Sequence, residues 1–389
     1  MAHHIPRVAL VFQTKLEEDI KVLNAISKYN RNHDQWSAYV DDEAVSAKNP
    51  EWLLRQSWDG IISKCDSPAL FEEALKKGIP CLDLSDSPRL TPGIPKIRPD
   101  NHAVGRAGAT HLIEKGIKTL AFCGFSNEEW SIERRQGFIS ALISGCPDPF
   151  IIESEYPAHS DPDWDMKETR FILTMLKKLP KPIGIMACND LRGIQIIAAC
   201  REAKIQVPEE VAVVGANNES IRCELTNPQL SSIPINAEFY GQKAAQMISS
   251  MIKNKSIVEN LVLVDPLEVE ARRSTDVFSI DDRAVIDALR LVRDNACKGI
   301  TVEELCTRVH ASRSLLERKF RKFLGRSPQA EIRNEQIKRV KQLLIETDYT
   351  LSRIAELCGF AYVEYLCLLF KKTTRMTPKQ YRQRFQMIH

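Results

Sequence analysis

No apolar run in this sequence of 389 residues approaches the roughly 20 residues of a membrane-spanning helix, which argues against an integral membrane protein. The opening residues "MAHHIPRVALVF" lack the basic stretch, apolar core and small-residue cleavage site of a secretory signal, so we expect a cytoplasmic protein with no membrane partner. The 11 cysteines stand singly, without a C-x-x-C pair or histidines at zinc spacing, and we expect reduced, mostly buried thiols. A P-loop, a G-x-S-x-G motif and a zinc signature are also absent, so the sequence predicts no catalytic residue, no metal site and no cofactor.

The charge that is present is distributed unevenly. From position 280 to the end, 22 Lys and Arg stand against 13 Asp and Glu, a balance of +9, whereas the other residues hold 32 basic and 38 acidic side chains, a balance of −6. A basic tail on an acidic body indicates a polyanionic partner such as nucleic acid for the tail, with a solvated basic surface as the alternative.

The basic tail contains one helical pattern twice. In "TVEELCTRVHASRSLLERKF", Thr301 and Glu304 fit a capping box, apolar residues follow at i, i+3, i+4 and i+7, and Ser312 and Gly325 fit the start and the end of a second helix. In "TLSRIAELCGFAYVEYLCLLFKK", which begins at Thr350, the pattern returns at an offset of about 50 residues. Each copy therefore predicts a helix-turn-helix whose second helix exposes a polar and basic stripe.

A longer helix from Pro328 to Glu346 is predicted between the two copies, with proline in its first turn. The "GF" at Gly359, the following "LLFKK", the "TP" at Thr377 and the "YR" at Tyr381 resemble the AraC/XylS family of transcription regulators. The resemblance implies seven helices and a rigid linking helix that places two recognition helices in successive major grooves of double-stranded promoter DNA, about 34 Å apart. It also implies an activator that recruits RNA polymerase.

The first copy offers the better candidates for reading bases. Arg318 suits a bidentate contact with guanine O6 and N7. The next candidates on the same stripe are Arg313, Ser314 and Glu317. The side chains expected to hold phosphates are Arg321, Lys322, Lys371 and Lys372.

The second copy departs from the family pattern, because Leu368 stands where an arginine is often found. We therefore expect weaker base readout from its stripe, which also contains Glu364 and Lys371. Two possibilities remain open: contact with thymine methyl groups through Val363 or Leu368, or contact mainly with the DNA backbone.

The long body before the tail alternates short apolar runs with amphipathic stretches. The runs include "RVALVFQT", "DGIIS", "IPCLDLS", "KTLAFCGF", "PIGIMACN" and "VAVVGANN". This alternation predicts an α/β fold with parallel sheets covered on both faces, in which ligands bind at the carboxyl ends of the strands.

Polar side chains at or near those ends suit a ligand rich in hydroxyl groups. The candidate contacts are Gln13, Asp83, Trp130, Arg134, Asn189, Asp190 and Asn217. Carboxylates and amides can bridge neighbouring hydroxyls, and the Trp130 ring can lie against the apolar face of a sugar. Alternatively, the Asp and Asn side chains only cap the following helices, and Trp130 packs in the core.

The body also resembles a known family. The stretches "DNHAVGRAGATHLIEKGIKTLAFCGF", "ACNDLRG", "VPEEVAVVGANNES" and "LSSIPIN" are similar to the LacI/GalR effector domain, of the type I periplasmic-binding-protein-like class. The resemblance implies two α/β lobes joined by three chain crossings, near 98–101, 233–236 and 263–266. By position, Asp83, Arg134, Asn189 and Asn217 match the sugar-contacting sites of that family. Its usual N-terminal DNA-binding headpiece is not found before Arg7, where the first strand opens.

Together the patterns give an α/β effector domain followed by an all-α domain. We expect the effector domain at 1–272, with lobe 1 at about 5–99 and 235–263 and lobe 2 at about 100–234 and 264–272. A linker is expected at 273–284, and a DNA-binding domain at 285–389 with helix-turn-helix units at 301–324 and 350–372 and the linking helix at 328–346.

As a whole, with "ARRSTD" at Ala271 and "RDNACKGI" at Arg293, the chain resembles the xylose-operon regulator type, which joins these two domains. The implied function is a dimeric, sugar-responsive transcription regulator, with a pentose as the expected monosaccharide, xylose before arabinose. Asn217 stands where this type has Asp, and Ile235 where it has Gln, so the identity of the sugar stays open. The rival hypotheses are a sugar-binding protein or a repair enzyme fused to a DNA-binding tail; the absence of an export signal and of a paired Cys and His argues against them.

Overall fold

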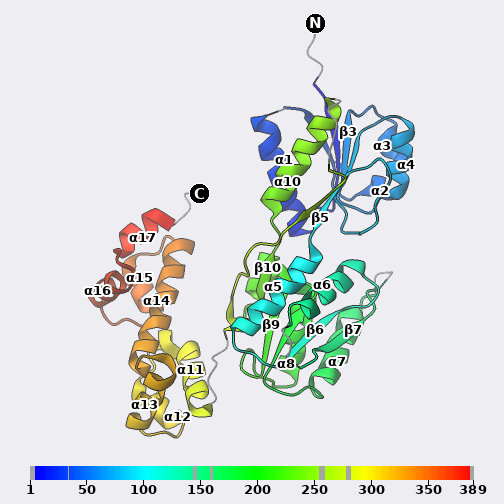
Figure 1. Ribbon diagram of the computed structural model, residues 1–389. Helices are drawn as coiled ribbons and strands as arrows, with labels where there is room; N and C mark the ends of the chain where they lie inside the picture. The colour runs from blue at the N-terminus through cyan, green and yellow to red at the C-terminus, as the bar shows by residue number, and fades with distance from the viewer. Residues whose placement is uncertain are drawn as a thin grey trace. The chain divides into compact units, whose positions relative to one another are not determined.

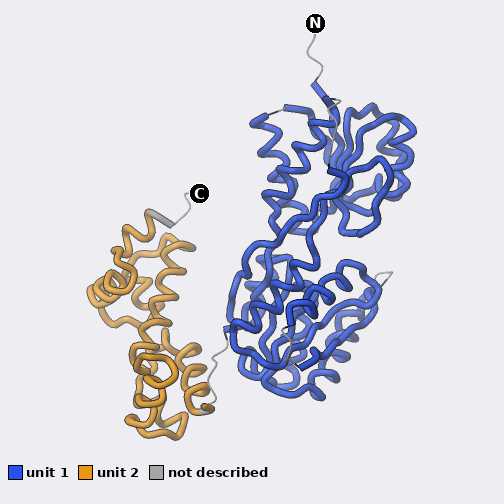
Figure 2. The backbone as a smooth tube through the Cα atoms, in the orientation of Figure 1, with its two compact units in different colours: residues 1–277 blue, residues 278–389 orange. Residues whose placement is uncertain are grey.

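The computed structural model describes residues 5–33, 35–142, 147–157, 161–253, 259–276 and 282–385. The chain divides into two compact units, Met1–Val277 and Phe278–His389 (Figure 2). The first unit contains two parallel sheets with helices on both faces, and the second is helical (Figure 1). Within the described ranges, no helix combines the length and the apolar character that crossing a bilayer requires.

The first sheet forms the centre of lobe 1 and has the strand order β11-β5-β4-β3-β1-β2. Its strands are β1 (Arg7–Val11), β2 (Ser37–Asp41), β3 (Gly60–Ser63), β4 (Cys81–Asp83), β5 (Lys96–Pro99) and β11 (Leu261–Val264). Val8 and Leu10 pack toward α1 (Glu17–Asn32) and α10 (Ala237–Ile252), while Ala9 and Val11 pack on the opposite face. That face is covered by α2 (Val45–Lys48), α3 (Pro50–Leu54) and α4 (Pro68–Lys76) (Figure 1). Burial on both faces explains the continuous apolar runs of the central strands.

The second sheet forms lobe 2 and has the order β10-β9-β8-β6-β7. Its strands are β6 (Leu120–Phe125), β7 (Phe150–Ser154), β8 (Ile183–Ala187), β9 (Val211–Asn217) and β10 (Ser231–Pro234). The helices of this lobe are α5 (Asn101–Glu114), α6 (Glu129–Ser140), α7 (Trp164–Leu176), α8 (Asp190–Glu202) and α9 (Ser220–Leu225). One core cluster joins the sheet to α5 and α6, and another joins it to α7 and α8.

The chain passes between the lobes three times, each time from the carboxyl end of a strand. It leaves β5 for α5, leaves β10 for α10, and leaves β11 for a segment that returns to lobe 2. In that segment Pro266 forms an isolated bridge with Ile235, between β10 and α10, and Glu270 forms one with Ser232 on β10. Because β5 and α5 are separated by one residue, and β10 and α10 by two, the carboxyl edges of the two sheets face each other. The expected two-lobed α/β fold is confirmed.

The second unit contains seven α-helices within its described residues. They are α11 (Arg283–Asn295), α12 (Val302–Arg308), α13 (Arg313–Leu324), α14 (Pro328–Glu346), α15 (Leu351–Leu357), α16 (Val363–Thr374) and α17 (Pro378–Phe385), with a 3-10 turn, η2, at Ala296–Lys298. One apolar core surrounds α12 and α13, a second surrounds α15 and α16, and α14 contributes to both. The all-α domain with two helix-turn-helix units is confirmed.

Local signals in the tail act as predicted. The Thr301 and Glu304 side chains form a reciprocal capping box, and Thr350 caps α15. Gly325 ends α13 with a left-handed backbone at φ 66°, where glycine carries no steric cost.

The sequence patterns did not predict the strands β2 and β7 of the first unit, because both are edge strands whose side chains are largely exposed and give no apolar run.

Candidate functional site

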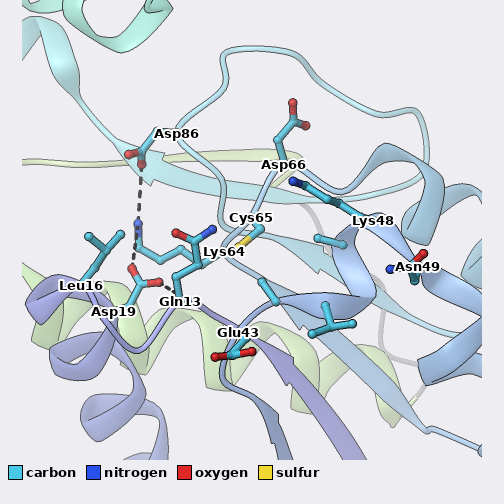
Figure 3. Close-up of a pocket in the computed structure, with 13 residues that line it drawn as sticks. Gln13, Leu16, Asp19, Glu43, Lys48, Asn49, Lys64, Cys65, Asp66 and Asp86 are labelled. Carbon is cyan, nitrogen blue, oxygen red and sulfur yellow. Dashed lines mark hydrogen bonds and ion pairs between the residues drawn. The ribbon is translucent and has the colours of Figure 1, made fainter. Parts of the chain in front are cut away.

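A pocket of about 540 Å³ opens at the carboxyl edge of the lobe 1 sheet (Figure 3). Gln13 follows β1 in the chain, Lys64 follows β3 and Asp86 follows β4, so parallel strands bring segments far apart in sequence to one rim. The N-terminal end of α1 adds Leu16 and Asp19, and Figure 3 shows these side chains gathered around the Lys64 ammonium group.

Lys64 is the electrostatic centre of this pocket. Its Nζ lies 2.8 Å from Glu18 Oε1, 3.8 Å from Asp19 Oδ1 and 3.7 Å from Asp86 Oδ1, and the side chain is almost wholly buried. Burial lowers the pKa of Lys64, but the carboxylates of Asp86 and Glu18 outweigh it and leave that pKa well above the usual value. Burial raises the pKa of Asp19 to about 6, against the attraction of Lys64.

The two lobe 1 residues expected to contact sugar have different environments. Gln13 is exposed and lines the pocket, while its backbone N–H donates to Asp19 Oδ2 at 3.0 Å. Asp83 does not line the pocket: it is buried, accepts from Lys96 Nζ at 2.8 Å and accepts from the Ser85 N–H at 2.8 Å. The Asp83 carboxylate therefore holds the β4–β5 connection in place from within the lobe.

In lobe 2, Arg134 lies beside the first crossing. Its Nε donates to Asn101 Oδ1 at 2.9 Å and a terminal nitrogen donates to the Cys188 carbonyl at 2.5 Å. Burial lowers the pKa of Arg134, while Asp86 and Glu18 of lobe 1 act in the opposite direction. Charges from lobe 1 thus reach Arg134, as expected for residues on facing edges of one cleft.

A polar network ties this arginine to the crossing. Asn101 also donates to Glu133 Oε2 at 3.3 Å, and Glu133 accepts from Arg98 on β5 at 2.6 Å. Trp130 is half-buried, with its ring 5.1 Å from the Arg134 guanidinium carbon and its Nε1 donating to Glu128 at 2.8 Å. Trp130 therefore packs on Arg134 beside the same network.

The three remaining candidates follow β8 and end β9. Asn189 caps α8 by accepting from the Arg192 N–H at 2.9 Å. Asp190 is fully buried and accepts from Ser232 Oγ at 2.5 Å and from the Glu219 N–H at 2.7 Å. Burial raises the pKa of Asp190 to about 6 even though these hydrogen bonds lower it. Both side chains therefore have internal partners, and Asp190 ties the ends of β9 and β10 to α8.

Asn217 differs from them. Its backbone has φ 96°, a left-handed conformation that is uncommon for any residue other than glycine. Its Oδ1 is buried and has no hydrogen-bond partner among the described residues. An unpaired buried amide oxygen at the carboxyl end of a strand is the kind of atom that a bound hydroxyl group would satisfy.

The sequence patterns missed several residues near the carboxyl edges of the two sheets. Lys64 comes from a short loop without a motif of its own. In lobe 2, Phe125, Tyr156 and Trp164 form an aromatic group with ring centroids 4.9 to 6.1 Å apart, and the Arg192 guanidinium lies 4.2 Å from the Phe125 ring. Tyr156 follows β7 by two residues, so prediction of that edge strand would have placed Tyr156 at the carboxyl end of a strand.

The helix-turn-helix units expose the predicted readout residues. On α13, Arg313, Ser314, Arg318 and Arg321 are exposed and Glu317 is partly buried; Arg313 forms ion pairs with Glu303 and Glu317. On α16, Glu364, Leu368 and Lys371 are exposed and Val363 is partly buried. Each unit therefore offers one face of its second helix to a partner.

Comparison with known proteins matches both units. Residues 109–275 match a family described as a periplasmic binding protein-like domain, and residues 305–384 match a helix-turn-helix domain. The chain is 32% identical to the xylose operon regulatory protein of Haemophilus influenzae, covering 98% of this chain and 99% of the relative. It is 29% identical to the protein of that name from Escherichia coli K12, covering 97% and 96%.

A solved structure of the xylose-binding transcription activator XylR is similar over 100% of both chains, with a TM-score of 0.80 and 28% identity. The similarity includes both units in the same order and extends over the full length of the relatives. This chain belongs to the family of xylose operon regulatory proteins.

Proposed function

We propose that this transcription regulator senses a pentose, D-xylose before arabinose, in the cleft of its first unit and activates promoters bound by its second unit. Full-length similarity to the xylose operon regulatory protein of Haemophilus influenzae is the observation that carries the proposal. The facing polar walls of the cleft supply matching chemistry, because ionised side chains form strong hydrogen bonds with hydroxyl groups and amide side chains add both donors and acceptors.

The sugar contacts divide between the lobes. In lobe 1 we assign them to Gln13, Lys64 and Asp86, which line the pocket. In lobe 2 we assign them to Arg134 and to Asn217, whose buried Oδ1 lacks a partner among the described residues. Asp83, Asn189 and Asp190 act as positioning residues, since their side chains already hold internal partners, and Trp130 supports Arg134.

The cleft is proposed to bind the sugar without reaction. Glu18, Asp86 and Asp19, the three acidic side chains paired with Lys64, have their charges opposed by that ammonium group, which suits binding more than proton transfer. Incubation of the protein with labelled xylose should return the sugar unchanged, and formation of any product would contradict this assignment.

The DNA contacts follow from exposure and chemistry. Arg318 on α13 is the proposed guanine reader, with Arg313, Ser314 and Glu317 beside it, while Arg321 and Lys371 hold phosphates. The working form is proposed to be a cytoplasmic homodimer that contacts RNA polymerase. Sugar binding favours a closed arrangement of the lobes and changes how the paired tails engage two half-sites; the shift is limited to the difference in sugar affinity between the two states.

The test combines sugar binding with DNA binding. A thermal-shift screen of D-xylose, L-arabinose, D-ribose and D-glucose should raise the melting temperature most with D-xylose, because a ligand at about 100 times its Kd adds roughly 2.7 kcal/mol to the free energy of unfolding. D-xylose should then change the affinity for, or the footprint on, a duplex selected from a random pool. The proposal fails if no pentose stabilises the protein, or if a stabilising pentose leaves DNA binding unchanged.

A further inference from the structure

The second helix-turn-helix unit exposes apolar side chains where the first exposes polar ones. Helices α13 and α16 align at an offset of 50 residues, with Leu316 and Phe320 of the first as completely buried as their counterparts in the second. The same alignment pairs Arg318 with Leu368, whose exposed fraction is 66%. Because the buried faces correspond, Leu368 occupies the place on α16 from which Arg318 points outward on α13.

The start of α16 shows a second difference from α13, the corresponding helix of the first helix-turn-helix. Ser312 caps α13 by accepting a hydrogen bond from the Leu315 N–H. Tyr362, at the equivalent position, makes no capping bond and is 72% exposed. Replacement of a capping residue by an exposed aromatic ring weakens the helix start, and such local violations are concentrated at functional surfaces.

Charged side chains around this apolar face favour a polyanion as its partner. Lys371 and Lys372 are exposed in the last turn of α16, and Arg375, also exposed, follows directly. An apolar centre with a basic rim suits the major groove of DNA, whose thymine C5-methyl group is an apolar feature between two rows of phosphates.

We propose that Leu368 reads a thymine methyl group in the half-site bound by the second helix-turn-helix unit. This inference rests on the proposed DNA-binding function and deepens it. The first helix-turn-helix recognises a hydrogen-bonding base edge through Arg318, and the second helix-turn-helix recognises the methyl group of an A·T pair. A leucine side chain has no donor or acceptor, so base discrimination at its position comes from the apolar contact.

The central experiment removes the methyl group without changing hydrogen bonding. Full-length protein with saturating D-xylose is titrated against a duplex selected from a random pool, and against duplexes in which single thymines are replaced by deoxyuridine. One replacement in the second half-site should weaken binding about fourfold, the value for loss of one buried methyl group. In Leu368→Ala the same replacement should have no effect, because the contact is already absent.

A second experiment exchanges the side chain types at positions 318 and 368. Leu368→Arg should shift the preferred base at that position from thymine to guanine, as the arginine at the equivalent position of α13 is proposed to do. The matched variant Arg318→Leu should lose guanine preference in the first half-site and leave the deoxyuridine effect in the second unchanged. Circular dichroism should show that both variants fold, because the changed side chains are exposed.

Each outcome decides between interpretations. If deoxyuridine at every position leaves wild-type binding unchanged, the methyl contact is refuted while the proposed function stands. If Leu368→Ala binds DNA normally but abolishes transcription in vitro, the apolar face contacts a protein instead, and the inference is wrong. If the wild-type protein binds no duplex from the pool, the proposed function itself fails.

Discussion

Removal of the Lys64 ammonium group tests the electrostatic account of the cleft. In Lys64→Met the side-chain volume is nearly kept, but Glu18, Asp19 and Asp86 lose the cation that opposes their charges. Loss of one partner from a buried ion pair costs about 3–5 kcal/mol in free energy of unfolding. Because Asp86 is about a third exposed and its pair is screened by solvent, we expect about 3 kcal/mol at pH 8.

The pH dependence of that loss gives the sharper test. Burial already raises the pKa of Asp19 to about 6 with Lys64 present, and removal of the cation raises it further. A carboxyl group whose pKa is higher in the folded than in the unfolded state binds more protons when folded, so the free energy of unfolding rises as pH falls. The deficit of Lys64→Met should therefore shrink between pH 8 and pH 5.

Urea unfolding followed by tryptophan fluorescence measures this deficit in the full chain. All five tryptophans lie in the first unit, three of them, Trp36, Trp52 and Trp58, in lobe 1. The matched control is Lys76→Met, which removes an exposed lysine paired with Glu72 and Glu73 and should leave the free energy of unfolding almost unchanged, because solvent screens an exposed pair. An equal loss in the two variants, or a Lys64→Met deficit that stays constant from pH 8 to pH 5, would refute the reasoning.

Four further substitutions test three other parts of the structure. Burial lowers the pKa of His111 from 6.5 to about 4, so the stability of the folded protein that depends on neutral His111 is complete above about pH 6.5 and is lost as pH falls toward 4. In His111→Gln, the free energy of unfolding should fall by up to about 3 kcal/mol less than in the wild type between pH 6.5 and pH 4, measured by tryptophan fluorescence. Gln336→Leu removes the buried amide that donates to the carbonyls of Ala296, Cys358 and Gly359, and should cost about 1–3 kcal/mol in unfolding of the tail measured by circular dichroism, with the tryptophan transition unchanged. Arg318→Ala should cost about 1–3 kcal/mol and relax one base position in a binding-site selection, whereas Arg321→Ala should weaken all sequences alike; an unchanged logo in Arg318→Ala would contradict the guanine assignment.

The tail was predictable because its signals are local. A capping box needs only Thr301 and Glu304, three residues apart, and a left-handed helix end needs only Gly325. The internal repeat then provides an independent check of the predicted helices, since two segments with the same pattern of apolar residues are expected to form the same pair of packed helices. The central strands were predictable for a related reason: burial on both faces leaves a continuous apolar run.

The cleft was less predictable because its environment is assembled from distant segments. Asp83 and Asp86 are three residues apart and look alike in sequence, yet Asp83 pairs with Lys96 inside lobe 1 while Asp86 lines the pocket. The difference lies in which way each side chain leaves the end of β4, which no spacing rule specifies. Lys64 gave no signal at all, because a single lysine after a strand is ordinary on a surface and becomes distinctive only when Glu18 and Asp86 surround it.

The two units hold their parts together in different ways, and this difference fits a sensor joined to a reader. Between the lobes, two contacts away from the chain crossings are formed by partly exposed polar side chains: Ser220 donates to Glu17 at 2.5 Å, and Lys21 donates to the Asn218 carbonyl at 3.2 Å. Water can replace such contacts at little cost, which agrees with the proposed opening and closing of the lobes. In the tail, by contrast, the fully buried Gln336 on the linking helix donates both to η2 beside the first helix-turn-helix and to the turn of the second. Water does not replace a buried bond of that kind, so Gln336 stabilises the spacing of the two recognition helices, and under the proposed function the sugar signal would act on the tail as a whole.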